Sequence, residues 1–399
     1  MVPDALLDLF RACRDAGGRA LLVGGSVRDA LLGRPGKDLD IEVHGLEQDA
    51  LVEVLRRFGH VNEVGRAFGV LKVRWQGLEL DVSVPRRDAR EGAGHKGIRA
   101  TADPHLGVTE AARRRDLTIN AIAWDPLTDT YEDPFDGRGD LARRLLRAVD
   151  PRTFGEDPLR ALRVVQFAAR FDFAVDPALE DLCAAMPLGE LPAERIRGEV
   201  EKLLEKGAHL AHGWALARRT GQWAKVLPEW DACPPDLDRV ARVPLADPQR
   251  RLALLYAAAC GNNDLVATTA VLDRLRVHRV GGYPVRRVVL GLVARREAAR
   301  GALDDAQVRR LGEEGDLDLL AALVGTETLL GAATRLGVRD APLPVLLTGA
   351  ELNALGVASG PDMGRVLAHV RTLQLDGLLH TREEARAAVA RLVEGGRTP

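Results

Sequence analysis

The length, composition and charge of the chain exclude several broad classes of protein. Its 399 residues exceed the usual size of one domain and allow two to four. A hydrophobic content of 46% and a charged content of 29% exclude a disordered chain, and no apolar run is long enough to cross a bilayer. We therefore expect a multidomain globular protein of the cytoplasm that does not associate with membranes.

The cysteines indicate neither a metal site nor a disulfide framework. Cys13, Cys183, Cys233 and Cys260 lie far apart, form no CxxC pair and have no neighbouring histidines. This spacing predicts reduced thiols, as expected in a reducing compartment.

Charge is unevenly distributed along the chain. The formal net charge is −2, but basic residues gather between 86 and 147, and acids gather at 38–53 and in the C-terminal half. A basic cluster is commonly a solvated face, and it is also what phosphate binding requires locally. The net charge therefore does not exclude a nucleic-acid partner.

The first 145 residues alternate strand-like and helix-like patterns. An apolar run ends at a glycine pair, and SVRDALLG then predicts a short helix with Ser26 as N-cap and Gly33 at its end. The predicted strands span 20–24, 37–43, 69–75 and 78–84, and a longer helix spans 48–59. This order predicts an α/β or α+β domain over residues 1–145.

From Phe154 onward the spacing of apolar residues is helical to the end of the chain. Stretches containing proline interrupt this pattern at 231–248 and 340–345. We therefore expect one helical segment over 146–230 and a second over 231–399.

Paired acids on one predicted strand are the first candidates for chemistry. Asp38 and Asp40 lie two residues apart, so both carboxylates leave the strand on the same face, and Asp81 on a later strand could lie beside them. Converging carboxylates are the ligands that Mg²⁺ prefers, and two such ions can activate a hydroxyl while neutralising a triphosphate. An isolated DxD pattern, however, is more often a solvated strand face.

The residues before these acids favour the functional interpretation. Gly24 and Gly25 precede a predicted helix N-terminus, so bare backbone N–H groups and Arg28 can meet phosphate oxygens close to the acids. A glycine turn and a capped helix would explain this segment alone, but its pairing with the acids is more specific.

Five motifs in a fixed order carry a resemblance to a known family. GGSVRDALLG…KDLDIE resembles the signature of the class II tRNA nucleotidyltransferases and bacterial poly(A) polymerases, within the DNA polymerase β nucleotidyltransferase superfamily. The later motifs also resemble this branch: RRDLTINAIAWDP (114–126), DPFDGRGDL (133–141), RAVDPRTFGEDPLRALRVVQFAARF (147–171) and LPAERIRGEVEKLL (191–204). The resemblance covers about residues 20–230. It implies a nucleotidyltransferase head with a mixed sheet over 1–145, followed by an all-α neck (146–230) and an all-α body and tail (231–399).

The resemblance also implies roles for these residues. Asp38 and Asp40 would bind Mg²⁺, and Gly25 and Arg28 would contact the triphosphate. Asp81 is the third candidate catalytic acid because of its place on the later strand, and Gly24 is a candidate for phosphate binding as the first residue of the glycine pair. Arg115 and Asp116 of the RRD motif would hold the nucleotide and its ribose, because a cation suits phosphate and a carboxylate suits hydroxyls.

The segment EDPLRALR is the expected base-reading element. Asp157 and Arg160 would be adjacent on one helix face, with Arg163 one turn later. Cytosine and adenine both present an amine beside an unprotonated ring nitrogen, which suits a carboxylate next to a guanidinium, whereas uracil and guanine would leave Asp157 facing an acceptor. Acids and proline in a helix's first turn are the structural alternative. Gln166 stands where some relatives have another arginine, which could alter nucleotide preference.

Two further segments bear on specificity. Residues 85–104 resemble the family's mobile loop that helps switch from C to A addition, at full length, and no role is assigned to His95 within it. Many bacterial relatives carry a His-Asp phosphohydrolase domain, but RLALLYAAACGNN (251–263) has Gly261-Asn262 where those ligands would stand. We expect a degenerate domain there that holds tRNA without hydrolase activity.

The leading hypothesis is therefore an enzyme that adds CCA, or part of it, to tRNA 3′ ends from CTP and ATP with Mg²⁺ and without a nucleic-acid template. Its expected partners are tRNA and the two nucleotides, with no obligate protein partner. An enzyme that adds only A, or a poly(A) polymerase, would use the same acids. A catalytically silent RNA-binding protein is the alternative of another class, although Asp38, Asp40 and Arg28 are intact. A metal phosphohydrolase is disfavoured by the missing ligands.

Overall fold

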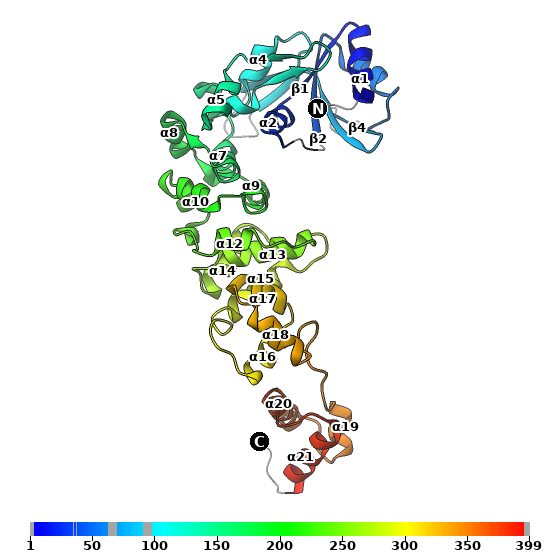
Figure 1. Ribbon diagram of the computed structural model, residues 1–399, viewed down its shortest axis with the longest axis vertical. Helices are drawn as coiled ribbons and strands as arrows, with labels where there is room; N and C mark the ends of the chain where they lie inside the picture. The colour runs from blue at the N-terminus through cyan, green and yellow to red at the C-terminus, as the bar shows by residue number, and fades with distance from the viewer. Residues whose placement is uncertain (1–3, 35, 37, 63–69, 91–97, 395–399) are drawn as a thin grey trace. The chain divides into compact units, whose positions relative to one another are not determined.

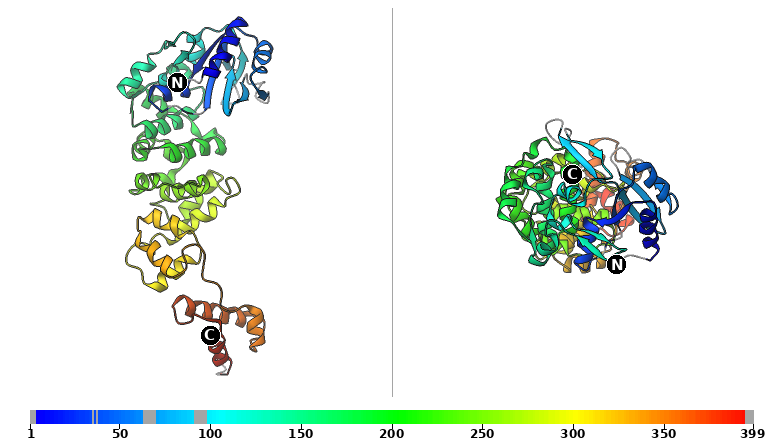
Figure 2. Two further views of the ribbon diagram at one scale, coloured as in Figure 1. Left: turned by 45° about the vertical axis from the view of Figure 1, so that its right-hand side comes forward. Right: turned by 90° about the horizontal axis from the view of Figure 1, so that it is seen from above.

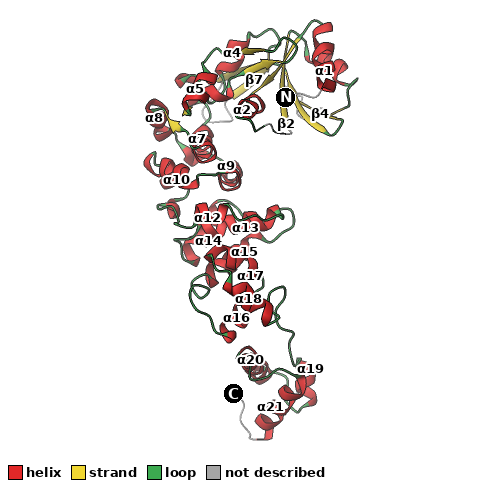
Figure 3. Ribbon diagram, viewed as in Figure 1, coloured by secondary structure: helices red, strands yellow, loops and turns green. Residues whose placement is uncertain are grey.

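The computed structural model describes residues 4–34, 36, 38–62, 70–90 and 98–394, except for the side chains of residues 4, 5, 38, 88–90, 98–100 and 394. The chain divides into two compact units, Met1–Ala232 and Cys233–Pro399 (Figure 1). The first unit contains all the strands that the structure describes, and the second consists of helices and their connections (Figure 3).

A seven-stranded mixed sheet is the centre of the first unit. Its strand order is β3-β4-β5-β2-β1-β8-β9, in which β2 and β5 are parallel and the other neighbouring pairs are antiparallel. The strands are β1 (Arg19–Val23), β2 (Asp38–His44), β3 (His60–Asn62), β4 (Val70–Trp75), β5 (Leu78–Ser83), β8 (Ala123–Asp125) and β9 (Thr130–Glu132). The four strands expected from the sequence therefore all form.

The first unit also contains helices before, between and after these strands. They are α1 (Asp4–Asp15), α2 (Gly25–Leu31), α3 (Gln48–Leu55), α4 (Val108–Arg113), α5 (Gly137–Arg143), α6 (Pro151–Phe154), α7 (Leu159–Phe171), α8 (Pro177–Ala185), α9 (Ala193–Lys206), α10 (Leu210–Arg219) and α11 (Gln222–Val226). Short 3₁₀ turns lie at η3 (Thr118–Asn120), η4 (Leu188–Glu190) and η5 (Pro228–Trp230), and a two-stranded parallel pair joins β10 (Leu145–Leu146) to β11 (Ala174–Val175).

The alternation of side chains along β2 explains how the sheet forms and what it displays. Ile41 and Val43 are fully buried, so the residues between them point to the opposite face. The register pairs the Cα atoms of Asp40 and Asp81 across β2 and β5, and Val82 is buried beside Ile41. One face of these two strands therefore belongs to the core, and the other carries acids.

The start of α2 differs from the sequence expectation. Gly24, with φ of 70° and ψ of −136°, is the N-cap, and Ser26 lies inside the first turn instead of capping it. The Ser26 hydroxyl donates a hydrogen bond to the carbonyl of Val23 at 2.9 Å. The prediction of Ser26 as N-cap was wrong because the chain turns at the glycine pair and enters the helix two residues earlier.

Much of the segment predicted as a loop at 85–104 forms a hairpin. Strands β6 (Arg86–Arg90) and β7 (Ile98–Ala102) pair in antiparallel fashion, with Arg86 opposite Ala102. Four of the five residues of β6 are charged, so this strand lacks the alternation of apolar and polar residues that would have marked it as a strand. His95 and the rest of 91–97 lie outside the described residues.

Three tryptophans pack against one another at the end of the first unit, on α10, α11 and η5. Trp214, Trp223 and Trp230 are at most 2% exposed, and their ring centroids lie 4.7 to 5.2 Å apart. Trp214 also donates from Nε1 to the carbonyl of Trp230 at 3.2 Å. Aromatic pairs of this kind add about 0.5 to 1.5 kcal/mol each beyond their buried area, so the cluster fixes α10, α11 and η5 as one block.

The second unit is built from ten helices in its described part. They are α12 (Leu237–Ala241), α13 (Pro248–Ala259), α14 (Leu265–Arg274), α15 (Val285–Arg295), α16 (Asp305–Gly312), α17 (Leu317–Val324), α18 (Thr328–Arg335), α19 (Gly349–Ala354), α20 (Pro361–Leu375) and α21 (Arg382–Glu394). Within the described residues, no helix is both long and apolar enough to span a bilayer.

Within the first unit, α7 packs against both α9 and α10 (Figure 1). Figure 2 shows the helices of this unit, in green, from a second side. The contact with α10 depends on Gly213, where a Cβ atom would lie 2.6 Å from the Cβ of Ala169 and 2.8 Å from the carbonyl oxygen of Val165. Any side chain there would force the two helices apart.

We therefore predict that Gly213→Ala lowers the free energy of unfolding by about 1 to 3 kcal/mol, because it overpacks the contact between α7 and α10. Urea denaturation of the two proteins measures this difference. Gly198→Ala on α9 is the matched control: no atom lies within 4 Å of its added Cβ, so it should stabilise the helix by about 0.5 to 1 kcal/mol. Equal effects of the two substitutions would contradict the proposed close packing.

Candidate functional site

A cavity of about 500 Å³ lies in the first unit, between the start of α2, the turn after α4, and helices α7 and α9. Nine residues singled out from the sequence line it: Gly24, Gly25, Arg28, Asp40, Arg115, Asp116, Asp157, Arg160 and Arg163. Eight further residues complete the lining, namely Asn120, Leu159, Gln166, Phe167, Arg170, Arg195, Lys202 and Lys206. Segments more than 170 residues apart in the chain thus meet at one cavity.

The lining is strongly basic. Six arginines and two lysines face three carboxylates, those of Asp40, Asp116 and Asp157. Such an excess of cations in a concave site attracts anions and suits a ligand with several negative charges. The carboxylates, in turn, can accept hydrogen bonds from hydroxyl or amine groups.

Gly24 is required by the close approach of Arg115. A Cβ atom at Gly24 would lie 2.8 Å from Nη1 of Arg115 and 3.6 Å from Oδ2 of Asp40. The positive φ of Gly24 is a second reason for glycine at this position. The glycine therefore lets a cation, a carboxylate and bare backbone come together at one end of the cavity.

Arg28 is buried at this end and held in a fixed orientation. It is 4% exposed, and its guanidinium lies 5.0 Å from the ring centroids of both Phe167 and Phe171. It donates to the Asp29 carboxylate at 2.8 Å and to the Asn120 side chain. Burial lowers the pKa of Arg28, and the adjacent Asp29 carboxylate opposes that shift.

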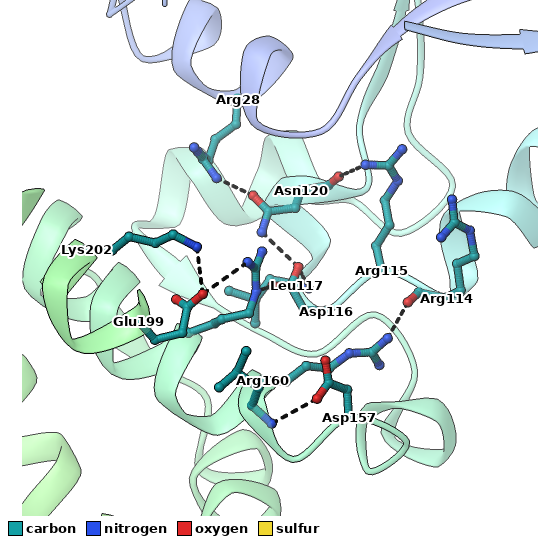
Figure 4. A network of polar contacts seen from close by, with 12 residues as sticks. Arg28, Arg114, Arg115, Asp116, Leu117, Asn120, Asp157, Arg160, Glu199 and Lys202 are labelled. Carbon is teal, nitrogen blue, oxygen red and sulfur yellow. Dashed lines mark hydrogen bonds and ion pairs between the residues drawn. The ribbon is translucent and has the colours of Figure 1, made fainter. Parts of the chain in front are cut away.

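Asp116 connects the turn after α4 to helix α7 (Figure 4). It is 7% exposed and accepts hydrogen bonds from the backbone N–H of Leu117 at 2.8 Å, from Nδ2 of Asn120 at 2.9 Å and from Nε of Arg163 at 2.7 Å. Burial by itself would raise the pKa of Asp116, but the Arg163 charge and these hydrogen bonds lower it below its usual range.

Glu42, which the sequence interpretation missed, lies beneath the RRD motif. It is 3% exposed, and Arg114 and Arg115 lie 3.6 and 3.8 Å from its Oε2. Burial would raise the pKa of Glu42, but the neighbouring His44 and the two arginines lower it to about 2. The third acid of the alternating segment DLDIE was the available signal, since it shares a strand face with Asp40.

Asp157 and Arg160 both reach the cavity, but not as neighbours on one helix face. Helix α7 begins only at Leu159, and the Asp157 carboxylate accepts from the Leu159 N–H at 3.1 Å and from Arg195 at 2.8 Å. The expectation that Asp157 lies in the helix was wrong, because the proline that follows it disfavours the helical conformation at Asp157. Arg160 donates to the carbonyls of Thr153 and Arg114, at 2.7 and 2.6 Å.

The other two predicted acids, Asp38 and Asp81, are not among the described residues that line the cavity. The backbone of Asp38 starts β2, but its side chain lies outside the described part. The Asp81 carboxylate accepts a hydrogen bond from Nζ of Lys72 at 2.9 Å. Both residues line a separate cavity of about 290 Å³, together with other residues of β3, β4 and β5. Among the described residues, no group of three His, Cys, Asp or Glu side chains is placed to hold a metal ion.

Several lining residues that the sequence interpretation missed lie on two helices. On α7, Phe167 and Arg170 continue the face that carries Arg163 and Gln166, and the four residues are spaced by three, one and three positions. On α9, Arg195, Lys202 and Lys206 are spaced by seven and four residues. Both spacings place side chains on one face of a helix. Basic residues at this periodicity were therefore a usable signal for the second wall of the cavity.

Comparison with known proteins gives this arrangement a class. Residues 20–147 match the family model described as the poly A polymerase head domain. The multifunctional CCA protein of Nitrosococcus oceani is 39% identical over 212 residues, which are 52% of this chain and 50% of that protein. The corresponding protein of an Azoarcus species is 41% identical over 218 residues, which are 53% and 50% of the two chains. The chain thus spans about half the length of these curated relatives.

Solved structures match over nearly the whole chain. The CCA-adding enzyme of Bacillus stearothermophilus in complex with CTP has a TM-score of 0.75 and 25% identity, with 99% of each chain covered. The Thermotoga maritima CCA-adding enzyme complexed with tRNA has a TM-score of 0.63 and 22% identity, with 98% of this chain and 96% of that chain covered.

These matches define the class of the chain. Residues 20–147 match the model of the poly A polymerase head domain, and the chain has the fold seen in the CCA-adding enzymes. The mixed sheet followed by helices, and the family resemblance expected from the sequence, are confirmed.

The Asp116 contacts predict how stability depends on pH. The folded state lowers the pKa of Asp116, so its contribution is complete above the unfolded value of 3.8 and is lost as pH falls through the lower folded value. Asp116→Asn should destabilise the protein by about 1 to 3 kcal/mol at neutral pH, because Arg163 loses its charged partner. This difference should shrink at acid pH.

Urea denaturation of wild type and variant at neutral pH and below pH 3.8 measures this effect. Asp8→Asn is the control, because the ion pair of Asp8 with Arg11 on α1 is exposed, and its effect should stay within about 0.5 kcal/mol. A difference for Asp116→Asn that is the same at both pH values would contradict the ionised contact.

Proposed function

We propose that this chain is a tRNA nucleotidyltransferase that adds CCA to tRNA 3′ ends from CTP and ATP, without a nucleic-acid template. The observation that carries the proposal is the shared cavity, where Gly24, Arg28 and Asp40 lie opposite Asp157 and Arg160. The substrate assignment is supported by the relatives, which are named multifunctional CCA proteins, and by the similar structures, which are CCA-adding enzymes in complex with CTP, ATP or tRNA. Because the chain spans half of those relatives' length, activity and partners belong to this proposal.

Nucleotidyltransferases of this superfamily generally use divalent metal ions, and we infer that Mg²⁺ is used here. Asp40 supports the inference, because its exposed carboxylate lines the cavity beside Gly24 and offers the hard oxygen ligands that Mg²⁺ prefers. Asp38 would complete the pair, and Asp81 would join only after its carboxylate leaves Lys72. The bound ions would neutralise the triphosphate and lower the pKa of the attacking 3′-hydroxyl.

The triphosphate would lie at the end of the cavity formed by the glycine pair. Backbone N–H groups and the Arg28 guanidinium would hold its oxygens, with Arg170 and the lysines of α9 as further cations. Asp116 would accept from the ribose hydroxyls, since its carboxylate oxygens retain acceptor capacity beyond the hydrogen bonds described above.

Base selection would depend on Asp157 and Arg160, each already held by other groups. Arg195 and the Leu159 N–H fix the plane of the Asp157 carboxylate, which can still accept from an exocyclic amine. Arg160 uses two of the five N–H donors of a guanidinium on backbone carbonyls, which leaves others for an unprotonated ring nitrogen. Uracil or guanine would place an acceptor against Asp157, and that mismatch is costly in a confined site.

The second unit would hold the tRNA through phosphate contacts and shape, without hydrolase activity, because Gly261 and Asn262 offer no metal ligands of the His-Asp type. A division of the first unit into a head (1–145) and a neck (146–230) is part of the same proposal, as is a cytoplasmic location. An enzyme adding only A, a poly(A) polymerase and a silent RNA-binding protein are the competing functions.

Asp40 is the candidate metal ligand that can be tested by its effect on the rate. With Mg²⁺ and labelled CTP or ATP, the purified protein should extend a tRNA that lacks its tail, and Asp40→Ala should reduce the rate roughly a thousandfold or more, because several kcal/mol of charge stabilisation are lost. The variant should remain folded by circular dichroism. Asp8→Ala on α1 is the control and should keep the wild-type rate. Full activity of Asp40→Ala would refute the metal assignment.

The competing polymerases differ in which RNA end they extend with which nucleotide. Three tRNAs, ending at the discriminator base, at C and at CC, are each offered one nucleotide at a time. We expect CTP to extend the first two and ATP to extend only the CC form. Extension of the CC form alone would identify an enzyme specialised for A addition. Repeated A addition to any RNA end would identify a poly(A) polymerase.

A further inference from the structure

Asn120, in the 3₁₀ turn η3, connects two parts of the cavity through its side-chain amide. It is 5% exposed and lies in the cavity lining. Its Oδ1 accepts a hydrogen bond from Nη1 of Arg28, and its Nδ2 donates to Oδ1 of Asp116 at 2.9 Å (Figure 4). The amide therefore lies between a cation and a carboxylate, and it is bonded to both.

The charges of the two partners decide the orientation of this amide. A reversed amide would direct its NH₂ group at the guanidinium and its oxygen at the carboxylate, so both contacts would become repulsive. A short side chain that offers one acceptor and one donor in the same plane is needed here. Asparagine meets that requirement, whereas an acid or an apolar residue would lose at least one of the contacts.

The amide extends a chain of hydrogen bonds across the cavity. Arg28 belongs to α2 at the glycine end, and Asp116 continues the chain to Arg163 on α7 at 2.7 Å. The backbone carbonyl of Asn120 also accepts from Nη1 of Arg115 at 3.2 Å. One residue thus contacts Arg28 and Asp116, which the proposed function assigns to the nucleotide, and Arg115, for which the family resemblance implies the same role.

We propose that Asn120 is a positioning residue that holds Arg28 and Asp116 in one geometry, so that the triphosphate and the ribose are recognised together. This inference rests on the proposed function. It assigns Asn120 no contact with the reacting atoms. Its effect passes through Arg28 and Asp116, which would otherwise be free to adopt orientations suited to only one part of the nucleotide.

A charge placed at position 120 provides a specific test. Asn120→Asp would direct a new carboxyl group at Asp116, with Arg28, Asp29, Arg115 and Arg163 as the other charged groups around it. Two carboxylates at this separation cannot both ionise without cost, so they tend to share a proton. When protonated, the new group can donate to Asp116 and accept from Arg28, as the amide does. A leucine can do neither at any pH.

The experiment measures kcat and KM for CTP addition to a tRNA ending at C, from about pH 6 to about pH 8.5, with the full chain. Asn120→Asp should lose roughly tenfold or more in kcat/KM at the alkaline end and recover toward the wild-type value at the acid end. Asn120→Leu should show a similar loss at every pH. Gln76→Glu, at the exposed turn between β4 and β5 and outside both cavities, adds the same charge as a control and should follow the wild-type profile.

Each outcome bears on the inference. A pH profile of Asn120→Asp parallel to that of wild type, or a wild-type kcat/KM for Asn120→Leu, overturns it and leaves the proposed function intact. A wild-type chain that neither extends tRNA nor binds CTP overturns both. If Asn120→Asp does not fold, Asn120→Ser replaces it: a shorter hydroxyl cannot bridge Arg28 and Asp116, so a wild-type KM for CTP in that variant overturns the inference.

Discussion

The ion pair between Asp116 and Arg163 is the contact on which the cavity depends. Asp116 follows α4 in the sheet domain and Arg163 lies on α7, so a bond of 2.7 Å joins two segments that are 47 residues apart in the chain. A buried carboxylate without its partner would be costly, which makes separation of the two walls unfavourable. Arg160 strengthens the same junction through two backbone carbonyls.

Many of the polar side chains that line the cavity already form hydrogen bonds with other groups of the protein. Arg28, Arg160 and Arg163 each bind an oxygen of the protein itself, and Asp157 accepts from Arg195. A nucleotide would therefore meet dipoles and charges whose orientation is already fixed, and little reorganisation energy would be spent on binding. The same arrangement explains why the neutral Asn120 amide lies between Arg28 and Asp116. It accepts a hydrogen bond from the cation and donates one to the carboxylate without adding a charge.

The packing around α7 gives this cavity its rigidity. Gly213 lets α10 approach α7 closely, and the tryptophan cluster holds α10 against α11 and η5. On the other side, Gly24 admits Arg115 where any side chain would collide with it. Close contact at these two glycines, with the buried Arg28 guanidinium over Phe167 and Phe171, leaves the lining side chains few alternative positions.

The sequence alone determined the order of the elements, the mixed N-terminal domain and nine of the residues that line the cavity, because periodicity and local motifs depend on neighbouring residues. It did not determine that Asp157 stays outside α7, that Asp81 binds Lys72 across β4 and β5, or that Glu42 lies under two arginines. Nor did it show the roles of Asn120 and Arg195 as partners of other site residues. Only the tertiary structure decided these points, since each depends on which charged groups from distant segments come within hydrogen-bonding distance.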